Sequence, residues 1–189
     1  ILSNNKNKVA AIIIEPIPGN MGLVLPKKNF LKQIRELCDI HDVILIFDEV
    51  MSGFRVACGG AQELYNIKPD LTAFGKIVGG GLPAAAYGGK KKIMSYLAPD
   101  GPVYQAGTLS GNPLAVSAGL TVLNKLNSNL YSKLELNSNK IQLGFEKNIS
   151  DFGIKAIVQR VGSMMTLFFT DLLSIDNYDD AKKCHLKIY

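Results

Sequence analysis

The amino-acid sequence predicts an α/β fold with a mostly parallel sheet, followed by the start of a smaller α+β domain. Apolar runs of strand length occupy residues 9–16, 43–47 and 71–74, and an amphipathic helical pattern separates the first two runs. A strand, a helix and a second strand within about 40 residues form a right-handed βαβ unit, which makes the strands parallel. Near residue 127 this alternation gives way to a helix and a hairpin pattern. We therefore predict that residues 1–127 are part of a large domain and that residues 128–189 begin a small one.

The composition excludes several classes of protein. With 189 residues and 47% hydrophobic content, the chain can build one sizeable core. No apolar run reaches the ~18 to 20 residues of a membrane span, and the lysines behind the net charge of +5 are dispersed, so neither a membrane nor a nucleic-acid partner is expected. Three scattered cysteines without metal-ligand spacing indicate a reducing compartment and no metal site. We expect a cytoplasmic protein, or a plastid one in a plant or alga.

The first predicted strand, residues 9–16, ends close to a carboxylate, Glu15, and a loop rich in Pro and Gly follows it. Asn20 is the polar residue of this loop best placed to contact a ligand, although asparagine is also common in turns. Asn29 is predicted to cap a helix that leads into the next strand. The predicted buried stripe of this helix consists of Phe30, Ile34, Leu37 and Cys38.

The two central strands end in charged residues. Residues 43–47 lead into Asp48 and Glu49, and residues 71–74 lead into Lys76. Because open α/β sheets bind ligands beyond the carboxyl ends of their strands, we expect these charges at the ligand-binding rim. Burial at the end of an apolar strand would partly desolvate Lys76, favour its neutral amine and suit it to form a Schiff base. The alternative is a purely structural ion pair between Lys76 and Asp48.

Small residues follow the predicted lysine strand. The glycines at residues 79–81 either let a planar ligand approach the backbone or form only a flexible turn. Residues 84–89 are predicted as a short strand and residues 90–97 as a helix, with a solvated lysine run that begins at Lys90.

A loop of small residues precedes the next predicted helix. Asn112 and Pro113 are expected as its N-cap and first-turn residues, and the helix is predicted to end at Leu126. Hydroxyls and free backbone N–H groups before a helix N-terminus suit a phosphate, which points to the loop that contains Gly107, Thr108, Ser110 and Gly111. Serine and threonine also occur at such positions merely as caps.

The last part of the chain is predicted to hold a helix over residues 130–149 and a hairpin of two strands over residues 154–162 and 163–170. A further helix is expected from Asp179 onward. Both ends of the chain look cut, because it begins with Ile1 and stops within that expected helix.

Six motifs, in this order, resemble one family of enzymes. They read EPIPGNMG, LIFDEVMSGFRV, PDLTAFGKIVGGGLP, AYGG, YQAGTLSGNP and GSMMTLFFTD. Together they resemble the class III aminotransferases, a group of pyridoxal phosphate (PLP) enzymes of fold type I, and the resemblance covers nearly the whole chain. Typical aminotransferases of this class are expected to read DEVQTG, whereas this chain has Met51 followed by FRV. That difference favours the aminomutases of the family, which convert glutamate-1-semialdehyde to 5-aminolevulinate.

The resemblance implies a role for each matching residue. Lys76 would hold the cofactor through a Schiff base, and Asp48 would pair with the pyridine nitrogen. Val50 would pack against one face of the ring, and Asn20 would lie near the ring hydroxyl. Thr108, together with surrounding N–H groups such as that of Gly107, would bind the phosphate.

In this fold the phosphate is usually that of the neighbouring subunit, so the resemblance also implies a homodimer. It further implies that the phosphate cup, an aromatic stacking partner and a mobile lid come from a segment before residue 1. The isolated chain is therefore expected neither to bind cofactor nor to turn over substrate.

The implied reaction is an intramolecular amino exchange, which makes the protein an isomerase of tetrapyrrole (porphyrin, haem and chlorophyll) biosynthesis. One alternative is a class III ω-aminotransferase that needs a separate keto acid acceptor. Another is a non-catalytic module for cofactor binding or dimerisation. A nucleotide phosphate loop is excluded, because FGKIVGGG lacks the GxxxxGK[ST] order.

Overall fold

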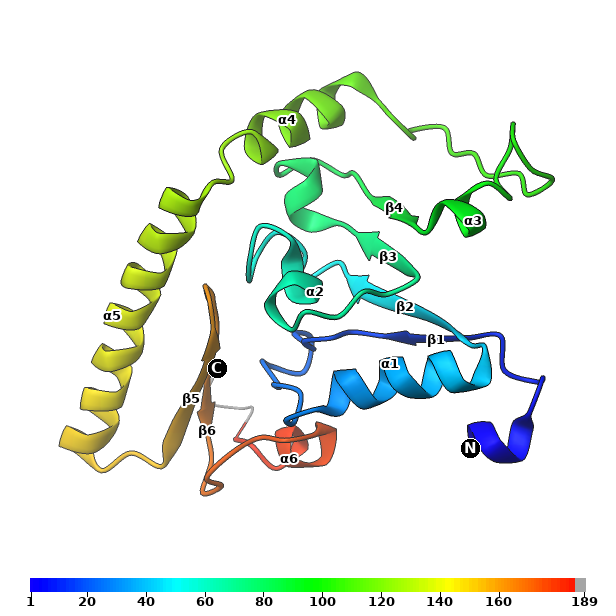
Figure 1. Cartoon of the computed structure of the whole chain (residues 1–189). Coiled ribbons are helices and arrows are strands. Elements are labelled where there is room, and N and C mark those ends of the chain that lie inside the picture. Colours follow the sequence, from blue (N-terminus) through cyan, green and yellow to red (C-terminus); the bar gives the residue numbers. More distant parts are fainter. Residues whose placement is uncertain (186–189) are drawn as a thin grey trace.

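A computed structural model describes residues 1–185 (Figure 1). The elements are η1 (Leu2–Asn5), β1 (Ala11–Ile14), α1 (Phe30–His41), β2 (Ile44–Glu49), α2 (Gly60–Leu64), β3 (Leu71–Phe74), η2 (Lys76–Gly79), β4 (Ala86–Gly89), α3 (Lys91–Met94), α4 (Pro113–Leu123), α5 (Ser128–Phe152), β5 (Ala156–Val161), β6 (Met164–Phe169) and α6 (Tyr178–Lys182).

The main sheet has four strands in the order β1-β2-β3-β4. The pairs β1–β2 and β2–β3 are parallel, and β4 pairs antiparallel with β3. The predicted mostly parallel α/β sheet is therefore confirmed. The helix α1 crosses between β1 and β2, as a parallel pair requires.

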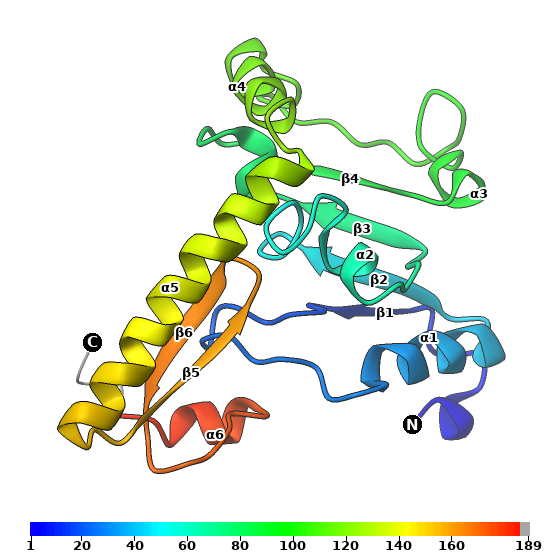
Figure 2. The same cartoon turned by 60° about the vertical axis from the view of Figure 1, so that its left-hand side comes forward.

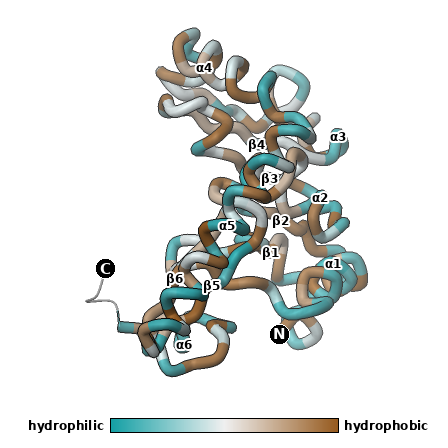
Figure 3. The backbone as a smooth tube through the Cα atoms, turned by 90° about the vertical axis from the view of Figure 1, so that its left-hand side faces the viewer, coloured by the Kyte–Doolittle hydropathy of each residue, from teal (hydrophilic) through white to brown (hydrophobic). Residues whose placement is uncertain are grey.

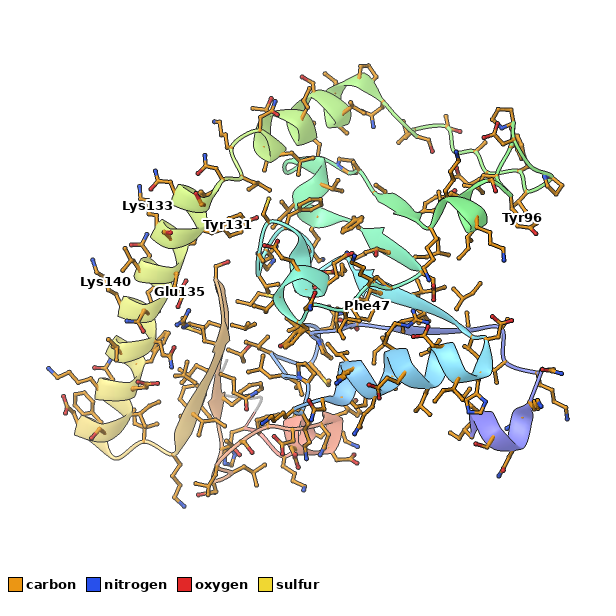
Figure 4. All side chains as sticks on the ribbon, in the orientation of Figure 1. Phe47, Tyr96, Tyr131, Lys133, Glu135 and Lys140 are labelled. Carbon is orange, nitrogen blue, oxygen red and sulfur yellow. The ribbon has the colours of Figure 1, made fainter. Side chains whose placement is uncertain are left out.

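The core of this sheet lies on the side of α1 (Figure 1). Leu45 and Phe47 are fully buried and pack with residues of α1 and the segment before β3. Figure 4 shows Phe47 among the side chains between the sheet and its helices. Deleting such a side chain leaves a cavity, so this cluster holds β2 in place.

The predicted buried stripe of α1 is wrong in part. Phe30 and Leu37 are 41% and 42% exposed, whereas Leu31 and Cys38 are buried and Ile34 packs against them. The expected cap is also wrong, because Asn29 adopts a left-handed conformation (φ 67°) and its side chain accepts no capping hydrogen bond. The helix buries the i, i+3, i+7 positions counted from Leu31 instead of those counted from Phe30.

The opposite face of the sheet carries exposed apolar residues. Ile13 is 65% exposed and Tyr87 is 47% exposed. Since residues paired in register share a face, Asp48, Ala73 and Tyr87 form one row across β2, β3 and β4 on this face. Asp48 therefore lies on the side of the sheet away from the α1 core.

The second part of the chain consists of α5 and the hairpin β5–β6, which stand side by side (Figure 2). The antiparallel hairpin is confirmed, with Gly162 in the turn at φ +54°. Glu135 points from α5 toward the hairpin, where it pairs with Arg160 at 2.7 Å, whereas Lys133 and Lys140 point away (Figure 4). The hairpin also contacts the loop after β1, and a domain boundary near residue 127 stays a prediction.

Several predicted helix bounds shift. The helix α5 is longer than predicted, because Asn127 Oδ1 accepts a hydrogen bond from the Leu130 N–H at 3.0 Å and starts the helix early. The helix α4 ends at Leu123 and α3 at Met94, both short of the predicted ends. The last helix, α6, ends at Lys182, and residues 186–189 lie outside the described part.

Within residues 1–185 no group of histidine, cysteine, aspartate and glutamate side chains could hold a metal ion. The three cysteines are free in this part of the chain. No helix in the described residues combines the length and apolar character needed to cross a membrane.

A buried carboxylate ties three parts of the α/β unit together. Asp70, at the start of β3, accepts hydrogen bonds from Arg35 Nη1 (2.8 Å) and the Leu45 N–H (2.7 Å) and pairs with Lys90 Nζ at 2.5 Å. Lys90, whose side chain is 58% exposed, belongs to the expected solvated lysine run and also pairs with Asp70. Burial alone would raise the pKa of Asp70, but the hydrogen bonds from Lys90, Leu45 and Arg35 outweigh it and hold the pKa below its ordinary value.

This network predicts an acid-dependent loss of stability. Because the folded pKa of Asp70 is depressed, its contribution is fully present above the unfolded value of about 3.9 and is lost as the pH falls through the folded value. Asp70→Asn should lower the free energy of unfolding by about 1–3 kcal/mol at pH 7. Urea unfolding of both proteins between pH 7 and pH 3 checks this, and the difference should shrink toward pH 3. A difference that stays constant with pH would contradict the prediction.

Candidate active site

Asp48 occupies the open face at the carboxyl end of β2. Its neighbours Phe47 and Glu49 are buried, because successive side chains of a strand point to opposite faces. Asp48 Oδ1 accepts a hydrogen bond from the Val50 N–H at 3.0 Å. This bond orients the carboxylate, and the other oxygen has no hydrogen-bond partner among the described residues, so it can receive a proton donor from a ligand.

Glu49 is not a rim charge, and that expectation is wrong. It is completely buried and accepts hydrogen bonds from Ser52 Oγ (3.0 Å), the Ala61 N–H (2.6 Å) and both the backbone and side-chain N–H groups of Gln62. These bonds tie β2 to the N-terminus of α2. Glu49 is therefore a structural residue that holds β2 to α2. The sequence could have indicated this, because successive side chains of a strand point to opposite faces, so Glu49 and Asp48 cannot both lie on the open face.

Lys76 begins the short 3-10 helix η2 directly after β3, in a left-handed conformation with φ +48°. Its side chain is exposed, so the expected partial desolvation is not present in this chain. No ion pair joins Lys76 to Asp48 among the described residues, which contradicts the alternative of a structural rim pair. In register, Asp48 pairs with Ala73, three residues before Lys76, so Lys76 lies at the same end of the sheet as Asp48.

Val50 packs next to the lysine turn. A Cβ placed on Gly75 would lie 3.1 Å from Val50 Cγ1, so a side chain there would have to push Val50 aside. Val50 lies between the two candidate residues. Its N–H donates a hydrogen bond to Asp48, and its side chain packs against Gly75, which precedes Lys76.

Gly80 and Gly81, which follow Lys76, have different structural roles. A Cβ on Gly80 would collide with the carbonyl oxygen of Ala118, and one on Gly119 would collide with that of Val78. The backbones of η2 and α4 therefore touch, and this contact positions the lysine turn. Gly81, at φ +96°, meets nothing within 4 Å and leaves open space beside the turn.

The loop before α4 is exposed, including Gly107 and Thr108. The predicted N-cap is confirmed, since Asn112 Oδ1 accepts a hydrogen bond from the Ala115 N–H at 2.9 Å. Gly107 and Val50 line one open hollow of about 590 Å³, whose walls come from β3, β4 and the start of α4. The structure thus brings Val50 and Gly107 to one hollow.

Asn20 lies elsewhere, in the loop after β1. It is exposed and lines a second hollow with Thr166 and Phe168 of β6. The described residues bring Asp48, Val50 and the turn of Lys76 together, and they show no hydrogen bond from Asn20 or Thr108 to this group. Glu15 follows β1 beside the position of Asp48, and its Oε2 is buried with no hydrogen-bond partner in the described chain.

Comparison with known proteins decides the family. Residues 1–183 match the family described as aminotransferase class-III. The chain belongs to the class-III aminotransferases. The resemblance drawn from the motifs is thereby confirmed, and so is the α/β fold expected for these enzymes.

Among class-III aminotransferases, the chain is similar to curated glutamate-1-semialdehyde 2,1-aminomutases. It is 53% identical to that of Desulfatibacillum aliphaticivorans over 95% of this chain and 42% of the relative. It is 58% identical to that of Chloroherpeton thalassium over 93% of this chain and 41% of the relative. The chain thus spans less than half the length of the curated relatives it matches.

Solved structures show the same fold. An omega-transaminase from Sphaerobacter thermophilus superposes with a TM-score of 0.89 at 33% identity, over 95% of this chain and 41% of that one. A glutamate-1-semialdehyde-aminomutase from Pseudomonas aeruginosa PAO1 superposes with a TM-score of 0.81 at 25% identity, again over 95% and 41%.

Proposed function

We propose that the protein is a PLP-dependent aminomutase that converts glutamate-1-semialdehyde to 5-aminolevulinate in tetrapyrrole biosynthesis. The observation that carries this proposal is the identity of 51–58% to curated relatives that share the aminomutase name. The reaction moves an amino group within one carbon skeleton, so the enzyme is an isomerase. A cytoplasmic location is part of the proposal.

The residues present fit PLP. Asp48 offers an oriented carboxylate with one unpartnered oxygen, Lys76 offers a free amine next to it along the sheet edge, and the Gly81 turn leaves room. The P. aeruginosa aminomutase with 24% identity, a K286A variant, was solved in complex with PMP. When bound, PLP supplies an electron sink for the carbanion that forms as the Cα proton leaves.

Each candidate site residue of this chain has a proposed role. Asp48 holds positive charge on the ring nitrogen, because a fixed carboxylate favours the protonated form of a base beside it. Lys76 would hold the cofactor through its aldehyde group, and its Nζ, when not bonded to the cofactor, would take and return the proton at the substrate carbon as general base and acid. Val50 packs on one face of the ring, next to Gly75. Asn20 donates a hydrogen bond to the ring hydroxyl.

The phosphate site is proposed to be shared between two subunits. Thr108 and the N–H of Gly107 would bind the phosphate of the partner's cofactor, and both residues are exposed. The helix that follows them supports a homodimer, because it exposes apolar side chains and is mostly hydrophobic in Figure 3. These exposed side chains are Leu114 (75%), Val116 (52%) and Leu120 (58%), and Leu109 of the loop is 70% exposed.

An assay with and without a keto acid acceptor tests the proposed reaction. The full-length protein should form 5-aminolevulinate from glutamate-1-semialdehyde alone, at a rate that added keto acid does not increase. A second candidate is an ω-aminotransferase, which the higher TM-score of the Sphaerobacter enzyme favours. Turnover that begins only after a keto acid is added would select this candidate and reject the aminomutase.

A further inference from the structure

The loop that carries Asn20 is held by side chains of the distant hairpin β5–β6. The Leu23 N–H donates a hydrogen bond to Thr166 Oγ1 at 3.0 Å, and the Leu23 carbonyl oxygen accepts one from Gln159 Nε2 at 2.7 Å. Both backbone polar groups of Leu23, three residues after Asn20, are therefore satisfied by the hairpin. Two side chains that bond to both backbone groups of one residue fix the position and the orientation of that residue relative to the hairpin.

Packing reinforces this clamp. Ile17 and Leu23 are 1% and 2% exposed and belong to one cluster with Met164 of β6. Gly22 adopts φ +86°, and a Cβ there would lie 2.5 Å from the Phe168 ring. The loop backbone is thus pinned on both sides of Asn20, whose own side chain is exposed.

Gln159 and Thr166 are held in the orientation that their hydrogen bonds to Leu23 require. Gln159 and Thr166 lie directly opposite each other in the hairpin register, so their side chains share one face. Gln159 is itself held, because its Oε1 accepts a hydrogen bond from the Ile175 N–H at 2.7 Å and its Nε2 also reaches the Ile175 carbonyl oxygen at 3.2 Å. Neither side chain is needed for strand pairing, which uses the backbone alone.

We propose that Gln159 and Thr166 are positioning residues, which set where the Asn20 amide meets the ring hydroxyl of the cofactor. This inference rests on the proposed function. A hydrogen bond weakens steeply outside a narrow range of distance and angle, so a loop held at Leu23 keeps the Asn20 contact and a released loop loses it. The hairpin would then contribute to cofactor affinity without touching the cofactor.

Substitution of Thr166 in the full-length protein tests the proposal. Thr166→Val keeps the shape of the side chain and removes the acceptor, and it should raise the dissociation constant for PLP by about three- to tenfold. It should also speed hydrogen exchange in residues 17–24 of the cofactor-free protein and shift the pH midpoint of the visible absorption band of the bound cofactor. Thr166→Ser keeps the acceptor and should restore all three values.

Arg160→Met is the matched control on the same hairpin. The Arg160 side chain donates hydrogen bonds to Glu135 and Gln142 of α5 and to the Gly162 carbonyl oxygen, and none, among the described residues, to the Asn20 loop, so its loss should lower stability and leave PLP affinity within about twofold. If Arg160→Met weakens PLP binding as much as Thr166→Val does, a general loosening of the hairpin explains the effect and the proposal is wrong.

A double-mutant cycle with Asn20→Ala completes the test. If Thr166 acts through Asn20, Thr166→Val should weaken PLP binding much less once Asn20 is alanine. An equal effect in both backgrounds overturns the inference while the proposed function stands. Failure of the unsubstituted protein to bind PLP rejects the proposed function itself, and the inference with it.

Discussion

Lys76→Ala in the full-length protein is expected to lower kcat by about 10²- to 10⁴-fold, because the substitution removes the group that moves the proton at the substrate carbon. It should also remove the borohydride-fixable attachment of PLP to the peptide that contains residue 76. Lys76 and alanine both carry a Cβ, so the left-handed backbone at φ +48° is equally strained in both proteins and the fold should not change. Steady-state kinetics and mass spectrometry of the reduced protein check both outcomes.

Two further variants sharpen this prediction. Lys76→Arg keeps the positive charge but cannot lose its proton in a protein, so it should be as inactive as Lys76→Ala. Lys91→Ala removes an exposed lysine of α3 and should leave kcat unchanged. Retention of more than about a tenth of the activity by Lys76→Ala would remove Lys76 from the proposed chemistry.

Asp48→Asn is expected to lower kcat by about a hundredfold or more and to leave thermal stability nearly unchanged, because it removes the charge that keeps the ring nitrogen protonated. The neighbouring Glu49→Gln should do the reverse. Its new amide group would face the N–H donors of Ala61 and Gln62 in a buried site, and the free energy of unfolding should fall by about 2–3 kcal/mol.

Kinetics and urea unfolding of these two variants separate the roles of adjacent carboxylates on opposite faces of β2. Equal losses of stability in both variants would show that Asp48 is structural. Unchanged kcat in Asp48→Asn, with PLP still bound, would contradict its pairing with the ring nitrogen.

Much of the fold follows from local patterns in the sequence. The strands β1, β2 and β3 are short apolar runs, and the crossover through α1 makes β1 and β2 parallel. The cap of α4 is equally local, since Asn112 and Pro113 act within one turn. Interactions within a few residues are those that a sequence pattern can predict.

The wrong predictions concern which side chains face the core and which are exposed. Both properties depend on the tertiary structure. Whether Phe30 or Leu31 starts the buried stripe depends on how α1 lies on the sheet. The burial of Glu49 depends on the donors that α2 brings to it from 12 residues away. The clamp on Leu23 joins residues 143 positions apart, and no local pattern indicates which polar residues of a hairpin meet a given loop.

The glycine contact between η2 and α4 bears on attempts to engineer new substrate scope. Gly80 and Gly119 let two backbones meet, so any side chain at either position would displace the lysine turn and the Thr108 loop in concert. A mutant library that samples these positions would mostly contain inactive clones. Diversity is better introduced at Ala85 and Tyr87, which are exposed and line the hollow near Val50.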